Sequence, residues 1–171
     1  MIASELFRDF DVGADVARPE TDPFTEDDAL QEAALVDVRM NALSGAVGLL
    51  FDLGGALELR LGSTGILIAR GIDQLSWVQT HGREGPIWYT VVGSTSQVEG
   101  NFLTLALDLL PDAELRIRLR SGTFYVGDVP GLSDAPPPDF TTADADTLWS
   151  SMVTWESEFE PSCAVVLEPR S

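Results

Sequence analysis

Residues 103–119 read LTLALDLLPDAELRIRL, and this stretch carries the clearest structural signal in the chain. Leucine or isoleucine recurs at alternate positions on both sides of Pro111-Asp112, with mostly polar or charged residues between. Alternation of this kind is typical of a strand buried on one face, and a proline turn between two such runs is typical of a hairpin. The stretch therefore predicts two antiparallel strands that pair with each other.

A related pattern stands 56 residues earlier in the chain. The two copies share order and spacing: Asp52-Leu53 and Glu58-Leu59-Arg60-Leu61 match Asp108-Leu109 and Glu114-Leu115-Arg116-Ile117. Gly54-Gly55 would form the first turn, because glycine adopts a positive φ without steric cost. The pattern predicts a duplicated hairpin, with a strand over 57–61 in the first copy. The alternative is that leucine-rich hairpins resemble each other by composition alone.

Further short apolar or alternating runs lie between turn residues. They predict strands near 36–40, 47–53, 66–69, 75–78, 87–92, 124–126 and 164–167. Eight or nine short strands at hairpin spacing predict a mainly β fold, an antiparallel meander that forms a strongly curled sheet or a barrel. We expect a single domain over residues 1–171, with an acidic N-terminal flank (1–34), a β core (35–132) and a C-terminal flank (133–171).

The N-terminal flank has a helical pattern instead of a two-residue period. Ala29, Leu30, Ala33 and Ala34 form an apolar stripe at helical spacing. Thr25 is a suitable N-cap, and Asp28 follows it in the capping-box position. The flank therefore predicts one helix over about residues 25–34.

The C-terminal flank begins with a proline run and then becomes ambiguous. Pro136-Pro137-Pro138 has no amide donors, which excludes a sheet interior and predicts a surface loop. Thr141 or Thr142 could cap a short helix that ends near Met152, while alternation over residues 153–159 suits an edge strand equally well. Both structures remain open for this segment.

The net charge of −18 is concentrated in the flanks. Residues 1–34 carry a net charge of −8, residues 133–171 carry −7, and the β core carries only −3. Such a surface repels nucleic acid and anionic membranes, and it speeds association with a basic protein. Acidity that serves only solubility is the competing interpretation. A first segment without basic residues, and the lack of any long apolar run, predict a cytoplasmic protein.

Several catalytic and cofactor sites are excluded by composition. Lysine is absent, so Schiff-base chemistry and the phosphate-binding lysine of nucleotide sites are excluded. His81 is the only histidine and lies in a glycine-flanked loop, where a solvated side chain is expected. Cys163 is the only cysteine, has apolar neighbours and is expected to pack as a small hydrophobic residue. We predict no metal, no cofactor and a non-enzymatic protein.

One carboxylate pair would give the chain a hydrolytic chemistry. Asp52 and Asp108 occupy equivalent positions of the repeat, opposite their leucine neighbours. A two-fold relation between the hairpins would bring them together as an acid and base pair in a glycosidase-like cleft. The interpretation that we favour is that each accepts hydrogen bonds from turn amides.

The most unusual feature of the core is cationic. Arg116, Arg118 and Arg120 share one face of one predicted strand, and the repeat would place Arg60 beside them. Like charges at this spacing repel each other unless negative charges neutralise them. These could come from the acidic flanks folding over the row, or from an anionic ligand or partner. We favour the flanks, and we keep these four arginines as the candidate ligand or partner site.

These observations favour a non-catalytic acidic protein that binds and masks a basic protein partner. Small acidic proteins that neutralise toxic nucleases, such as immunity proteins and antitoxins, act in this way, and the link is one of analogy alone. The alternatives are a β-barrel that binds a small molecule or an anion, and the carboxylate-dependent hydrolase. The oligomeric state is not predicted.

Overall fold

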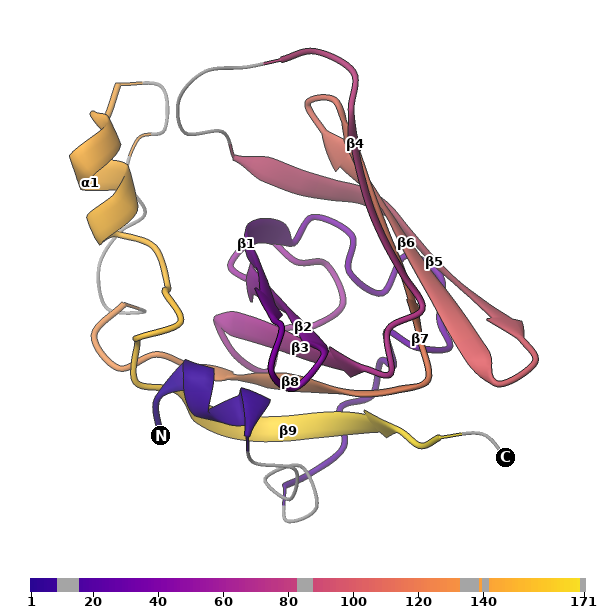
Figure 1. Cartoon of the computed structure of the whole chain (residues 1–171). Coiled ribbons are helices and arrows are strands. Elements are labelled where there is room, and N and C mark those ends of the chain that lie inside the picture. The colour runs from indigo at the N-terminus through magenta and orange to yellow at the C-terminus, as the bar shows by residue number, and fades with distance from the viewer. Residues whose placement is uncertain (9–15, 83–87, 133–138, 140–141, 170–171) are drawn as a thin grey trace.

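The computed structural model describes residues 1–8, 16–82, 88–132, 139 and 142–169. Over these residues it is a mainly β protein with one nine-stranded antiparallel sheet, one 3-10 helix and one short α-helix (Figure 1). This confirms the predicted fold class. The elements in chain order are η1 (Ala3–Phe7), β1 (Ala34–Asn41), β2 (Ala46–Asp52), β3 (Thr64–Arg70), β4 (Gln74–Gln79), β5 (Tyr89–Glu99), β6 (Phe102–Leu110), β7 (Ala113–Leu119), β8 (Ser121–Asp128), α1 (Ala145–Ser150) and β9 (Glu160–Leu167).

The sheet bends sharply between its two halves. Its strand order is β4-β7-β6-β5-β1-β2-β3-β8-β9, so it has two ends and is a curled open sheet. β1 and β5 pair only through Ala34 with Thr90 and Leu35 with Tyr89, and then they diverge. The four strands β4, β7, β6 and β5 form one wall, and β1, β2, β3, β8 and β9 form the other (Figure 1).

The main apolar core fills the space between the two walls. The predicted alternation is confirmed on β6 and β7, whose leucines and isoleucine at odd-numbered positions face this core while the polar residues between them face solvent. Leucines from both walls belong to one cluster, for example Leu49 and Leu67 from one wall with Leu107 and Leu115 from the other. Burying each such side chain contributes about 1.5–3 kcal/mol, so this core is the main source of stability.

A second apolar layer covers the outer face of β2, β3 and β8, which are therefore buried on both faces. It is built from η1 and from the segment 153–159, so both flanks contribute. Ser4 N–H donates to the Trp155 carbonyl at 2.8 Å, and Phe159 N–H donates to the Met1 carbonyl at 2.7 Å. The acidic flanks are thus an integral part of the fold.

The predicted helix over 25–34 is wrong, although its apolar stripe is buried as expected. The segment forms successive turns, and Asp28 and Glu32 adopt positive φ values of 58° and 64°, which no helix allows. Its backbone pairs with β5 instead: Glu32 N–H donates to the Val91 carbonyl, and Val91 N–H donates to the Ala33 carbonyl, both at 2.8 Å. These bonds cover the edge of β5 that β1 leaves open.

The predicted strand over 57–61 is also wrong. The chain between β2 and β3 is a loop in which Leu59 is buried, while Leu57 and Leu61 are exposed. β2 already pairs with β1 on one edge and with β3 on the other, so no edge remains for this segment. The first copy of the repeat is therefore not a hairpin, whereas the second is the β6–β7 hairpin.

The C-terminal flank contains both a helix and a strand. Asp144, and not Thr142, caps α1, with its carboxylate accepting from Thr147 N–H at 2.7 Å. Val153, Trp155 and Phe159 are buried, but 153–159 is not a regular strand, and β9 follows it. Thr141 and the Pro136–Pro138 loop lie outside the described residues. Among the helices of the described residues, none has the length and apolarity needed to cross a membrane.

Candidate functional site

The predicted arginine row lies on the solvent face of β7. Arg116 and Arg118 alternate with buried Leu115 and Ile117, so their guanidinium groups point away from the core. Arg120 follows directly after the strand and is exposed. The row is thus brought together as predicted, on the outer face of the β4-β7-β6-β5 wall.

Two acids of the β core, one on β7 itself and one directly before β4, neutralise most of this row. The Arg116 guanidinium contacts the carboxylate of Glu114, two residues before it on β7. Arg118 Nη1 lies 2.6 Å from Oδ2 of Asp73, the residue directly before β4. The expectation that the acidic flanks pair with the row is therefore wrong for these two arginines. The acids come from the β core, because β4 lies directly beside β7.

Arg120 has a different environment. Its Cζ lies 4.9 Å from the ring centroid of Phe102, and Arg118 Cζ lies 4.4 Å from the same ring. Stacking of this kind contributes about 0.5–1 kcal/mol at exposed sites. Among the described residues, no carboxylate forms an ion pair with Arg120. It is the one member of the row that retains an unneutralised charge there.

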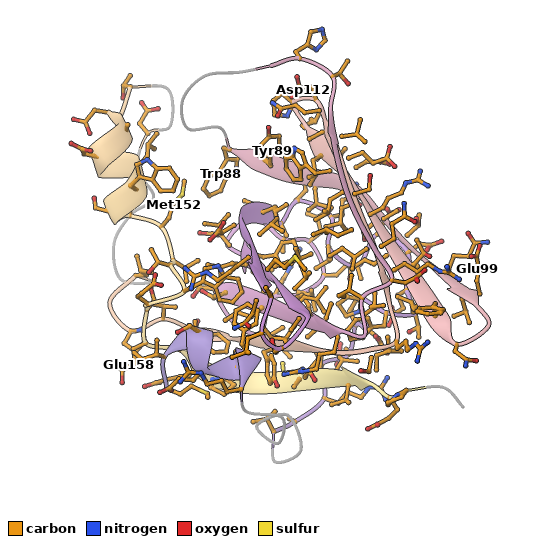
Figure 2. All side chains as sticks on the ribbon, in the orientation of Figure 1. Trp88, Tyr89, Glu99, Asp112, Met152 and Glu158 are labelled. Carbon is orange, nitrogen blue, oxygen red and sulfur yellow. The ribbon has the colours of Figure 1, made fainter. Side chains whose placement is uncertain are left out.

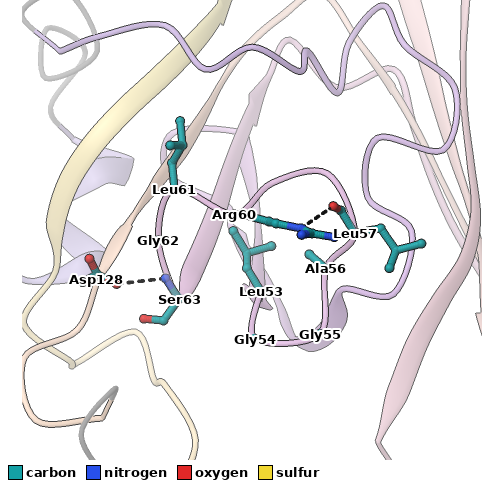
Figure 3. A pocket seen from close by; sticks show the side chains of 10 residues that line it. All are labelled: Leu53, Gly54, Gly55, Ala56, Leu57, Arg60, Leu61, Gly62, Ser63 and Asp128. Carbon is teal, nitrogen blue, oxygen red and sulfur yellow. Dashed lines mark hydrogen bonds between the residues drawn. The ribbon is translucent and has the colours of Figure 1, made fainter.

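Arg60 does not belong to the row. It lies in the loop between β2 and β3, and its Nε donates to the Leu57 carbonyl at 2.7 Å (Figure 3). The expected proximity depended on a duplicated hairpin, and the first hairpin does not form. Arg60 instead lines an open surface hollow of about 710 Å³, whose wall is formed by Leu53, Gly54, Gly55, Ala56, Leu57, Arg60, Leu61, Gly62, Ser63 and Asp128.

This loop hollow has the size of a small-molecule site, but its lining carries one charge of each sign. Its volume lies within the range of about 300–1,000 Å³ that is usual for small-molecule sites. It offers one guanidinium group, from Arg60, and one carboxylate, from Asp128, which accepts from Ser63 N–H at 2.9 Å (Figure 3). The space between the two walls, in contrast, is filled by the side chains of the main core. The interior therefore gives no support to the alternative of a β-barrel that binds a small molecule.

Asp52 and Asp108 are kept apart by the topology. β1 and β5 lie between the strands that carry them, so three interstrand steps of about 4.8 Å, roughly 14 Å in all, separate their backbones along the sheet. Both side chains lie on the outer face, opposite the core residues Phe51 and Leu107, where curvature increases the separation. Glycosidase pairs lie about 5–9.5 Å apart. The arrangement therefore does not support a carboxylate-dependent hydrolase.

Asp52 instead accepts a turn amide, as our favoured interpretation predicts. Gly54 N–H donates to its Oδ1 at 2.7 Å. Burial raises the pKa of Asp52, and the Gly54 hydrogen bond partly opposes that effect. Because the pKa is raised in the folded chain, ionised Asp52 lowers the stability of the fold as pH rises through this raised pKa.

Replacing Asp52 with asparagine is therefore expected to raise the free energy of unfolding at pH 7, because the amide keeps an acceptor for Gly54 without the buried charge. The gain should shrink as pH falls towards about 4, near the ordinary pKa of aspartate, because the raised pKa of Asp52 makes it take up a proton as pH approaches that range. Urea unfolding at both pH values measures it. Exposed Glu99→Gln is the control for simply lowering net charge. A gain that is equal for both variants, or that grows on acidification, would contradict the assignment.

The environments of the remaining candidates for catalytic chemistry, Cys163 and His81, do not favour catalysis. Cys163 is buried in the main core, and burial raises the pKa of its thiol, which makes the thiolate scarce. The His81 side chain is largely exposed, and its Nδ1 lies 3.4 Å from Asp112 Oδ2. Within the described residues, no group of three or more histidine, cysteine or acidic side chains could hold a metal ion.

A second hollow lies on the outer face of the β4-β7-β6-β5 wall and is acidic. It has a volume of about 230 Å³ and is lined by Val78, Thr80, Val92, Asp108, Leu109, Asp112, Ala113 and Glu114. Cross-strand register explains the grouping, because Val78 pairs with Glu114, which pairs with Asp108. Figure 2 shows Asp112 at this end of the wall and Glu99 at the opposite end. We call this feature the acidic hollow.

β4, which borders the acidic hollow, is the most apolar exposed strand. Leu75, Trp77 and Val78 are 38%, 41% and 58% exposed, and the strand QLSWVQ has no charged residue. Trp77 packs edge-on against Tyr89, with ring centroids 5.1 Å apart, so its orientation is fixed. We call β4 together with the acidic hollow the β4 surface. Aromatic anchors beside charged groups are typical of protein interfaces.

The sequence predicted a strand at 75–78 but not its exposure. Leu75 and Trp77 share one face and Val78 lies on the other, so the strand is apolar on both faces. The exposure comes from strand order, because β4 lies at one end of the sheet with β7 as its pairing partner. That position follows from long-range pairing, for example between Trp77 and Leu115, which local patterns do not reveal.

Comparisons with known proteins add little to this description. No protein-family model matches the sequence, and no curated protein matches it. Among solved structures, the crystal structure of an uncharacterized protein from Neisseria gonorrhoeae is 9% identical, with a TM-score of 0.42, over 58% of this chain and 94% of that chain. A similarity at this level carries no information on family or function.

Proposed function

We propose that this chain is a non-catalytic binding protein that uses the β4 surface to bind and mask a basic protein. The observation that carries the proposal is the exposed, uncharged, tryptophan-bearing edge strand beside the carboxylates of the acidic hollow. An apolar anchor next to acidic groups suits a partner surface that combines hydrophobic and cationic side chains.

The net charge gives this surface a long-range role. A chain of −18 attracts a basic partner and raises the association rate, while like-charged proteins are repelled. Exposed charge pairs add little to the final affinity. The apolar anchor Trp77, which becomes buried on binding, should therefore determine the lifetime of the complex. Masking of this kind resembles the action of small acidic proteins that neutralise nucleases, which remains an analogy.

The proposal predicts that Trp77→Ala weakens binding to the partner about 30-fold, because a central aromatic anchor commonly contributes about 2 kcal/mol. The partner is first captured from lysate of the source cells on the immobilised full chain, identified by mass spectrometry and purified. Its affinity is then measured by calorimetry at about 0.05 M and about 0.5 M salt, where screening should weaken binding.

Trp149→Ala is the matched control, since Trp149 is also exposed but lies on α1. It should leave affinity unchanged and should not alter the salt dependence. Capture of no basic protein, or equal loss of affinity in the two variants, would refute the proposed function. Capture that ignores salt would refute the electrostatic part.

A further inference from the structure

We propose that the basic partner binds by adding an extended segment to the open edge of β4, as a further strand of the sheet. This inference rests on the proposed function and specifies its binding mode and the chemistry of the bound segment. Strand addition supplies affinity through main-chain hydrogen bonds and specificity through alternate side chains. It requires an edge that is free, regular and unprotected.

The other edges of this sheet carry protective features. At β9, Ala164 N–H donates to the Ala17 carbonyl at 2.8 Å, and the strand contains Pro161, which has no amide donor. The open part of β1 follows a bulge and carries the charged residues Asp37 and Arg39. The edge of β5 is covered by the turns before β1. Bulges, charges, prolines and covering segments are the usual means by which sheets avoid pairing with other chains.

β4 has none of these features. Its register with β7 is continuous from Gln74–Arg118 to Gln79–Ala113, without a bulge. It contains neither a charged residue nor a proline. In the part of the chain that the structure describes, no other strand pairs with it. The other edges of the sheet are protected, whereas the β4 edge is apolar, regular and open. It is therefore the edge suited to pairing with another chain.

The hydrogen-bond phase of β4 identifies the free backbone groups. Thr80 N–H donates to the Asp112 carbonyl at 3.0 Å, which places Thr80 in a position that bonds to β7. Because antiparallel strands alternate between bonded and non-bonded positions, Ser76 and Val78 also face β7. Leu75, Trp77 and Gln79 then direct their N–H and C=O groups to the open edge. An added strand would bond to these three residues.

The side chains beside this edge define the partner segment. On the inner face, an added residue would lie next to Leu75 and Trp77, which favours a β-branched or aromatic side chain. On the outer face, it would lie next to Val78, where a long cationic side chain would share the Glu114 carboxylate of the acidic hollow with Arg116. The segment is therefore an extended stretch that alternates apolar residues with arginine or lysine.

A second copy of this chain is a poor occupant of the same edge. β4 could pair with its own copy geometrically, but each copy carries −18 and the two would repel each other. A cationic segment is instead attracted by the negative charge of the chain. The charge of the chain thus selects the basic partner and discourages self-pairing through β4.

The first experiment uses a synthetic peptide of about eight residues that alternates arginine with valine, together with the full chain. The control peptide has the same composition, with the arginines in one block and the valines in another. We expect the alternating peptide to bind at least tenfold more tightly than the control. Equal binding of the two peptides would mean that charge alone attracts them, and it would overturn strand addition.

The second experiment separates backbone pairing from side-chain contact. Leu75→Ala and Leu75→Pro both remove the leucine, but the proline also removes an outward N–H and leaves the bonds to β7 in place. We expect the proline variant to bind the alternating peptide at least tenfold more weakly than the alanine variant. Equal affinities of two folded variants would overturn the proposal.

Hydrogen exchange gives a readout that does not depend on a variant. In the free chain, the amides of Leu75, Trp77 and Gln79 should exchange faster than those of Ser76 and Val78. The alternating peptide should slow the exchange of the first three at least tenfold. If they remain fast in the complex, strand addition is wrong, whereas loss of affinity in Trp77→Ala for the captured partner would still support the proposed function. Dimers of the free chain that protect the same amides would assign the edge to a second copy.

Discussion

Replacing Trp155 with alanine is expected to lower the free energy of unfolding by about 3–5 kcal/mol, the range for removing a large buried aromatic side chain. Trp155 is only 1% exposed and fills the second apolar layer, where its ring lies 5.0 Å from that of Phe7. Its Nε1 donates to Asp37 Oδ2 at 2.8 Å. The substitution would therefore leave a cavity, and the Asp37 carboxylate would keep only the donor Val38 N–H.

Urea unfolding of the full chain, followed by circular dichroism, measures this effect, and the melting temperature should fall by roughly 10 °C. Trp149→Ala is the matched control, because Trp149 is 58% exposed, and its effect should stay within about 0.5 kcal/mol. Trp155→Phe keeps a ring but not the N–H, so its effect should lie between the two.

The outcome tests whether the acidic flanks belong to the fold. Met1 and Phe159 are joined through backbone hydrogen bonds, and η1 packs against the same layer as Trp155. If Trp155→Ala cost less than about 1 kcal/mol, the flanks would be loosely attached appendages on a stable β core. A loss of the expected size would show that residues far apart in the chain stabilise one layer cooperatively.

The parts of the fold that could be predicted are those with local causes. The alternation around Pro111 specifies β6 and β7, because both strands present apolar residues to one core and pair through a short turn. The outward position of Arg116 and Arg118 follows from the same period. Sequence was sufficient here because neighbours in the chain are also neighbours in the sheet.

The errors arise where distant strands decide the local structure. The alternation in 57–61 is as regular as that in β7, yet both edges of β2 are already occupied, so the segment remains a loop. The helical stripe in 25–34 is real, but the open edge of β5 takes its backbone hydrogen bonds. In both segments the apolar pattern predicted the burial of some residues correctly. It predicted the backbone conformation incorrectly.

The candidate site shows the same limit. The arginine row was visible in the sequence, but its acid Asp73 directly precedes β4, which reaches β7 only through long-range pairing. The exposed β4 edge, the feature on which the proposed function rests, depends on strand order. No spacing or composition within residues 74–79 distinguishes an edge strand from an interior one.

Replacing Gly127 with alanine is expected to destabilise the fold by about 3 kcal/mol, at the upper end of what overpacking costs. A Cβ at Gly127 would collide with the carbonyl oxygen of Glu160 and lie 2.9 Å from Phe159 Cζ. Gly62 packs against the same peptide, since a Cβ on Gly62 would lie 2.5 Å from the Gly127 oxygen. Backbone from three segments meets here, and backbone cannot move aside as a flexible side chain can.

The cause of this effect can be separated from backbone conformation. Gly127 does not have a positive φ, so alanine could adopt its backbone angles, and the expected loss comes from contact alone. Gly82→Ala is the matched control: Gly82 is exposed, has open space around its Cβ position and also lacks a positive φ. Urea unfolding should show a change within about 0.5 kcal/mol for Gly82→Ala. Equal stability of the two variants would mean that β8 and β9 separate easily at the bulge after Val126, and that the C-terminal strand is only weakly held to the sheet.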